Sequence, residues 1–176
     1  MRSIGSTTQK QTEPGMASED RGVIYPVVWI TLAAALLLQV MPMPDSFLLF
    51  RPAWIAMTLI FWSLAYPLKV GVFHGFVCGL LLDLINGTPM GQTALLLSGV
   101  GFLTLLLYPR IRLYSLWQQA PVVMAITGLS LLCEQWMRVL FHASQLHIEF
   151  IYAAVISGVL WPWFFTLLMT IKRKLI

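Results

Sequence analysis

Charged side chains are scarce in this 176-residue chain: Lys, Arg, Asp and Glu together make up 10% of it, whereas 59% of the residues are hydrophobic. Soluble domains carry about 25% charged and roughly 45–50% apolar residues, so this composition excludes an ordinary soluble domain. The apolar residues come in successive blocks, which short segments containing Pro, Gly or Arg separate. This pattern is typical of a bundle of membrane helices.

Cysteine is nearly absent as well, and recognisable catalytic motifs are lacking. Cys78 and Cys133 fall inside apolar blocks and form no CxxC or Cys/His pattern, so we expect two buried free thiols and no metal site. The sequence has no HExxH, GxSxG or glycine-rich phosphate-loop motif, and no loop long enough to form an aqueous catalytic domain. These absences predict a protein without enzymatic activity or a bound cofactor. The sequence has no soluble basic face of the kind that binds nucleic acid, so we expect no nucleic-acid partner.

Six apolar blocks approach the length of roughly 17–25 residues that crosses a bilayer. The predicted spans are residues 23–41, 53–66, 70–85, 89–108, 118–141 and 150–171. The second and third of them are short by this measure. The sequence therefore predicts an all-α integral membrane protein, built as a bundle of six transmembrane helices.

Turn-forming residues support the boundaries around the third span. Pro67 divides the long apolar run that holds the second and third spans, because proline would break a single helix there. Asn86-Gly87 is a typical turn signal, and Thr88 with Pro89 is typical of an N-cap followed by the first helical turn. The fourth span is therefore expected to start at this turn.

Basic residues predict the orientation, since Lys and Arg accumulate in cytoplasmic segments of membrane proteins. With six spans and a cytoplasmic N-terminus, only Arg51 of the eleven basic residues faces outside, and Arg138 lies within the fifth span. We therefore predict that both termini are cytoplasmic, with residues 1–22 as a mobile polar tail and residues 172–176 as a basic C-terminal segment. The pI near 9.3 reflects these basic anchors, which anionic lipid attracts.

The third predicted span carries a ridge of small residues. Gly71, Gly75, Gly79 and Asp83 are spaced by four, and each step of four turns only about 40° round a helix. Glycines in such a row let the backbone of a neighbouring helix approach closely. The three glycines are thus candidate packing residues, either for another helix of this chain or for the helix of a docking partner.

Asp83 raises a separate question, because a carboxylate within a membrane helix needs a partner. The fifth span offers Glu134 and Arg138, which lie one turn apart in the favourable order for an ion pair. We expect an intramembrane polar cluster of Asp83, Glu134 and Arg138, in which Arg138 bridges both carboxylates. Such a cluster could be structural, could dock a partner, or could relay protons or a solute.

The longest outer segment, residues 41–52, contains three prolines and a central apolar run. This composition favours a segment that lies at the membrane interface or folds back onto the bundle. Arg51 and Pro52 start the second span and are the candidate outer contact residues. They pack at the interface or form a surface for a partner.

Several stretches together resemble one family. The blocks are LLLQVMPMPD, FRPAW, FWSLAYP, GFVCGLLLDLINGTPMGQTAL and GVLWPWFF, and their order resembles MreD, the rod shape-determining membrane proteins of bacteria. The resemblance covers nearly everything from about Met16 to the C-terminus. Its most specific part is the GxxxGxxxD ridge, followed by the Asn-Gly turn and Gly91.

The resemblance implies a non-enzymatic, multi-pass scaffold subunit of the cell-elongation (rod) complex in the bacterial inner membrane. Such a subunit would dock the bitopic protein MreC and, through it, couple MreB filaments to RodA and a class B penicillin-binding protein. It would thereby support lateral peptidoglycan synthesis and rod cell shape. The competing class is the substrate-binding membrane subunit of an energy-coupling-factor-like transporter, which is also a small six-span protein. That reading requires several polar side chains on the outer connections, which are short and mildly polar here.

Overall fold

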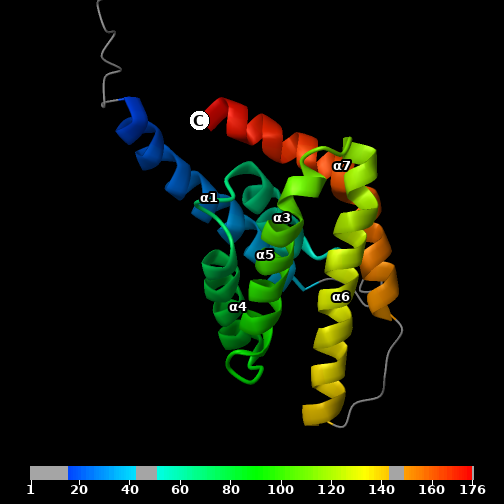
Figure 1. The fold of residues 1–176 in the computed structure, drawn as a ribbon. Coiled ribbons are helices and arrows are strands. Elements are labelled where there is room, and N and C mark those ends of the chain that lie inside the picture. Colours follow the sequence, from blue (N-terminus) through cyan, green and yellow to red (C-terminus); the bar gives the residue numbers. More distant parts are fainter. Residues whose placement is uncertain (1–15, 43–50, 143–148, 176) are drawn as a thin grey trace, which may run out of the picture.

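The computed structural model describes residues 16–42, 51–142 and 149–175, and every regular element in these ranges is a helix (Figure 1). The helices are α1 (Met16–Val40), α3 (Trp54–Ala65), α4 (Val72–Asn86), α5 (Gln92–Ile111), α6 (Leu116–His142) and α7 (Glu149–Leu175). They follow the order of the six predicted apolar blocks. The all-α class predicted from the sequence is therefore confirmed.

The first helix begins earlier than predicted. α1 starts at Met16, so residues 16–22, which we expected in a mobile tail, are helical. The remainder of the predicted tail, residues 1–15, lies outside the described residues. The same holds for residues 43–50 of the outer segment.

The apolar helical segments fall into two groups by length. The segments Gln92–Ile111, Leu116–Leu140 and Ile151–Leu175 are long and apolar enough to cross a membrane, by length and composition. In contrast, α3 has 12 residues and α4 has 15, which correspond to about 18 and 22 Å at 1.5 Å per residue. A hydrocarbon core is about 30 Å thick. Three helices are therefore candidate membrane spans, and six crossings stay a prediction.

The short helix α3 forms the centre of the bundle. Nine consecutive residues, Ile55 to Ser63, are buried, and α3 contacts each of the other five described helices. A helix that is apolar all round is expected in such a fully enclosed position. The indole N–H of Trp62 donates to Thr31 Oγ1 of α1 at 2.8 Å. The core thus satisfies this buried donor through a neighbouring helix.

The glycine ridge of α4 faces α5. A Cβ added at Gly75 would lie 2.8 Å from the carbonyl carbon of Leu97, and one added at Gly79 would lie 2.6 Å from the backbone nitrogen of Ala94. At Gly71 the nearest atom belongs instead to a side chain, that of Leu105 on α5. Of the two alternatives for this ridge, the structure has a helix of the same chain in place. A partner's helix would have to displace α5.

The two cysteines differ in exposure. Both are free thiols, but Cys78 is buried and Cys133 is exposed on α6. The expectation of two buried thiols is therefore wrong for Cys133. Its surroundings explain the difference, because Trp136 and Leu140 further along α6 are also exposed, so this face of the helix has no neighbour within the described chain.

The last helix changes direction along its length (Figure 1). Pro162 lies inside α7, and a proline within a helix removes a backbone hydrogen bond and bends it. The C-terminal half then runs across the end of the bundle, where Lys172 Nζ lies 4.6 Å from the centre of the Tyr66 ring and Lys69 Nζ lies 5.7 Å from it. We call this the basic end. The α4–α5 turn lies at the opposite end (Figure 1).

Candidate functional site

Asp83 is almost fully enclosed, with 1% of its surface exposed. Its carboxylate accepts hydrogen bonds from the hydroxyl of Thr88 at 2.7 Å and from three backbone N–H groups: those of Thr93 at 2.9 Å, Gly91 at 3.0 Å and Ala94 at 3.3 Å. All these donors belong to the α4–α5 turn or to the first turn of α5. The buried charge is therefore fully surrounded by donors.

The local sequence explains this arrangement. The first N–H groups of a helix have no partner within the helix, and a side-chain oxygen at the N-cap usually accepts one of them. The N-cap of α5 is Gly91, which has a φ of 99° and no side chain. Asp83 supplies the missing acceptor from the last turn of α4, and its negative charge is favourable at a helix N-terminus.

The backbone of Asp83 holds the other side of the turn. Its carbonyl oxygen accepts from the N–H of Gly87, the left-handed residue that ends α4, and from the N–H of Thr88 at 3.1 Å. One residue thus closes the end of one helix and the start of the next. The predicted N-cap role of Thr88 is wrong, because α5 begins only after Gly91 and the Thr88 hydroxyl donates to Asp83 instead.

The predicted bridge from Arg138 to Asp83 is also absent. Within residues 16–42, 51–142 and 149–175, the ion pair found joins Arg138 to Glu134, one turn away on α6. Asp83 has no need of the guanidinium, because backbone donors already fixed by α5 occupy its oxygens. The predicted cluster of three is therefore divided into a capping carboxylate and a separate ion pair.

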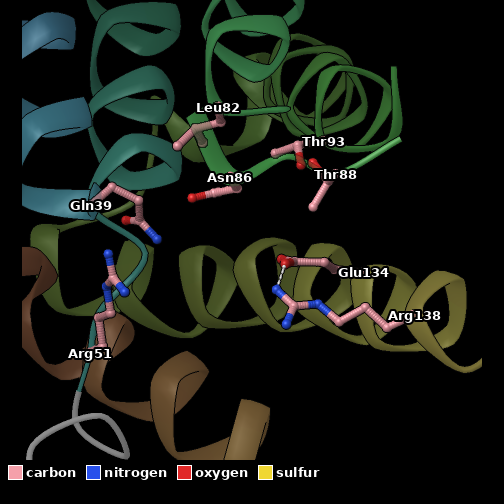
Figure 2. A pocket seen from close by; sticks show the side chains of 8 residues that line it. All are labelled: Gln39, Arg51, Leu82, Asn86, Thr88, Thr93, Glu134 and Arg138. Atoms are coloured by element: carbon pink, nitrogen blue, oxygen red, sulfur yellow. Dashed lines mark hydrogen bonds and ion pairs between the residues drawn. The ribbon is translucent and has the colours of Figure 1, made fainter. Parts of the chain in front are cut away.

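A polar cavity of about 510 Å³ lies between these two groups. Figure 2 shows Arg51 and Gln39 on one side of it, the Glu134–Arg138 pair of α6 on another, and the α4–α5 turn opposite that pair. The lining residues are Gln39, Arg51, Leu82, Asn86, Thr88, Thr93, Glu134 and Arg138. The cavity thus brings together three of the charged residues singled out from the sequence. Asp83 lies behind Thr88 and Thr93, which donate to it.

Hydrogen-bond donors exceed acceptors among the charged groups of this cavity. Two guanidiniums, those of Arg51 and Arg138, line it together with one carboxylate, that of Glu134. The Nε of Arg51 is buried and has no hydrogen-bond partner in the part of the chain that the structure describes. Burial lowers the pKa of Arg51, and the nearby negative charge of Glu134 acts in the opposite direction. The cavity is therefore suited to carboxylate or carbonyl oxygens from another molecule.

The comparisons with known proteins agree on one family. The family model described as rod shape-determining protein MreD matches residues 20–171. The chain is also 35% identical over 150 residues to the rod shape-determining protein MreD of Haemophilus influenzae, an alignment that covers 83% of this chain and 93% of the relative. The chain belongs to the MreD family. No solved structure matches it. Membership gives it a role in rod cell shape and places it among membrane proteins.

The two candidate outer contact residues of this MreD-family chain occupy different environments. Arg51 lines the cavity, whereas Pro52 is buried. The next residue, Ala53, donates its N–H to Ser157 Oγ of α7 at 3.0 Å. The segment that enters α3 is thus held against α7, and of the two candidates Arg51 is the one that lines the cavity.

Sequence reasoning did not single out Gln39, Asn86 or Thr93 as site residues. Gln39 Oε1 accepts the N–H of Trp54 at 3.1 Å, which fixes the end of α1 beside the start of α3. A lone glutamine near the end of an apolar helix is the signal that could have revealed it, because its amide needs partners. In the described residues, no group of three His, Cys, Asp or Glu side chains could hold a metal ion.

Proposed function

We propose that this chain is a membrane scaffold subunit of the bacterial cell-elongation complex that docks the bitopic protein MreC. Family membership supports a role in rod shape. The observation that carries the docking proposal is the cavity lined by Arg51, Glu134 and Arg138, in which donor groups exceed acceptor groups. Docking of MreC would support lateral peptidoglycan synthesis.

The proposed orientation follows from the charges. Lys69, Arg112 and Lys172 lie at the basic end, and basic residues of membrane proteins accumulate on the cytoplasmic side. With six crossings of the inner membrane, both termini are cytoplasmic and the cavity opens toward the outer face. In that position it meets the part of MreC that leaves the membrane.

The docking chemistry follows from the ion pair on α6. The side chain of Arg138 is 54% exposed and that of Glu134 is 27% exposed. An exposed arginine near the end of an apolar helix is costly to leave in lipid and is stabilised when a partner supplies oxygen acceptors. We propose that a segment of MreC with acidic side chains or free backbone carbonyls enters the cavity beside Arg138.

The remaining partners are reached through this contact or directly. RodA, its class B penicillin-binding protein and MreB filaments join the complex through MreC or by further surfaces of this chain. Exposed apolar residues such as Phe102 on α5 and Trp136 on α6 offer lipid or helix contacts along the bundle. The scaffold itself supplies positions for these proteins and no reacting group.

Co-purification of the tagged full chain with MreC from solubilised membranes tests this proposal. We expect Arg138→Gln to reduce recovered MreC several-fold, because the substitution removes charged donors and leaves Glu134 without its partner. Arg173→Gln, an exposed substitution at the basic end, is the matched control and should retain MreC. Full recovery of MreC with Arg138→Gln, or equal loss with both variants, contradicts docking at the cavity.

The volume of the cavity also suits a small polar metabolite, since ligand pockets measure roughly 300–1,000 Å³. This observation keeps the transporter-subunit alternative testable. The same purified protein, analysed for bound small molecules by mass spectrometry, should carry none if MreC is the ligand. A metabolite that is retained by the wild type and lost in Arg138→Gln, with MreC recovery unchanged, would favour the transporter.

A further inference from the structure

A second cavity, of about 460 Å³, lies at the basic end between α3, α5, α6 and α7. Its apolar lining includes Phe61 of α3 with Phe165 and Met169 of α7. Arg112, which directly follows α5, and Lys172, in the last turn of α7, line it as well. The cavity therefore combines apolar walls with two cations from different helices.

The cations have weak partners within the chain. Arg112 Nη1 donates to the hydroxyl of Tyr108 over a long 3.4 Å, and Lys172 Nζ lies above the ring of Tyr66. Neither contact neutralises a charge, and no carboxylate lines the cavity among the described residues. Two positive charges at one cavity without a counter-ion point to an anionic ligand.

The other buried polar group of the cavity is already satisfied. Gln119 donates through Nε2 to the carbonyl oxygens of Ile111 at 3.3 Å and Tyr114 at 3.1 Å. Its Oε1 accepts the indole N–H of Trp161 at 3.4 Å. The amide thus holds the α5–α6 connection in place. A ligand would find its polar contacts at Arg112, Lys172 and Tyr108.

We propose that this cavity is a binding site for an anionic phospholipid. The phosphate lies between Arg112 and Lys172, and an acyl chain follows the apolar side chains of Phe61, Phe165 and Met169. Basic pockets between membrane helices recognise anionic headgroups in this way. The site is separate from the MreC cavity, which lies at the other end of the bundle, and it does not depend on that proposal.

The shape of the lining distinguishes a lipid from a soluble phosphate. Free phosphate would use the two cations and leave the aromatic walls exposed to water, which is unfavourable for apolar surface. A phospholipid covers both parts at once. The neighbouring Ala65, which lines the same cavity, provides a place where a larger side chain would fill the apolar part without changing the charge.

Native mass spectrometry of the full chain in detergent, with added phosphatidylglycerol or phosphatidylcholine, tests the site. We expect one phosphatidylglycerol to bind in preference to phosphatidylcholine. Arg112→Gln combined with Lys172→Gln should weaken its binding about 30-fold, which corresponds to about 2 kcal/mol for two basic residues. Arg110→Gln with Lys174→Gln is the matched control: both residues are exposed, close to the substituted ones, and absent from the lining.

Four outcomes would overturn the proposal. Equal weakening by both double variants would show diffuse attraction to the basic end. Equal binding of the two lipids would show that charge does not select the ligand. Glycerol phosphate that competes as strongly as the lipid would show a soluble phosphate site. Ala65→Phe, which keeps both charges, should also reduce lipid binding, and unchanged binding in that variant would remove the acyl chain from the cavity.

Discussion

Replacing Gly79 with alanine tests the close approach of α4 to α5. The added Cβ would lie 2.6 Å from the backbone nitrogen of Ala94 and 2.6 Å from the carbonyl oxygen of Thr93. No rotamer change relieves a clash with backbone, so the helices must separate. Overpacking of this kind costs about 1–3 kcal/mol, and separation also lengthens the bonds from Thr93 and Ala94 to Asp83. After a gain of about 0.5–1 kcal/mol for alanine over glycine in a helix, we expect a net loss of about 1–2 kcal/mol.

The matched control for this substitution is Gly99→Ala on α5. A Cβ at Gly99 meets nothing within 4 Å, so this variant should be as stable as the wild type or more stable by up to about 1 kcal/mol. Unfolding of the purified proteins in mixed detergent, followed by tryptophan fluorescence, gives both free-energy differences. A Gly79→Ala variant as stable as Gly99→Ala would refute the close backbone packing.

Three further predictions concern Asp83 and the α4–α5 turn, and the same unfolding measurement tests them. Asp83→Ala should lose about 2–4 kcal/mol of stability, because a cap and several charge-assisted hydrogen bonds disappear. Asp83→Asn should lose less, since it keeps one acceptor oxygen, and equal losses would show that one oxygen does not preserve the cap. The stability losses of Asp83→Ala and Arg138→Ala should add up in the double variant, because the two side chains are not partners. A coupling energy above about 0.5 kcal/mol between them would show that they interact. Gly87→Ala, at a φ of 65°, should cost about 1 kcal/mol for the left-handed conformation, and an unchanged stability would show that the turn adapts.

Features that depend on local spacing could be predicted from the sequence. The six apolar blocks and their order follow from composition and turn residues, and the structure has a helix at each block. The ridge of Gly75 and Gly79 follows from a spacing of four, which places both residues on one side of a helix. The pair of Glu134 and Arg138 follows from the same rule.

The partner of Asp83 could not be predicted, because it depends on the path of the chain through a turn. The need of a buried carboxylate for a partner suggested a charged residue on another helix. The donors are instead the Thr88 hydroxyl and three backbone N–H groups eight to eleven residues away, at Gly91 and in the first turn of α5. A glycine N-cap at Gly91 leaves the start of α5 without its own acceptor, and a nearby aspartate on the preceding helix is the signal that connects the two. The early start of α1 at Met16 was missed for a simpler reason, since a polar segment can continue a helix beyond its apolar part.

The cavity of Figure 2 was only partly foreseeable. Arg51, Glu134 and Arg138 stood out as charges in an apolar chain, whereas Gln39 and Asn86 are uncharged and gave a weaker signal. The walls come from segments that are distant in sequence, so their meeting depends on how α3 sits at the centre of the bundle. Helix packing of this kind is a tertiary property that no local pattern contains.

The most direct test of the docking proposal is photo-crosslinking in intact cells. A photoreactive residue in place of Asn86, which is exposed and lines the cavity, should crosslink the full chain to MreC. The same residue in place of Phe102, which is exposed on α5 away from the lining, should give little product. Crosslinks to MreC from the Phe102 position with none from the Asn86 position would contradict docking at the cavity.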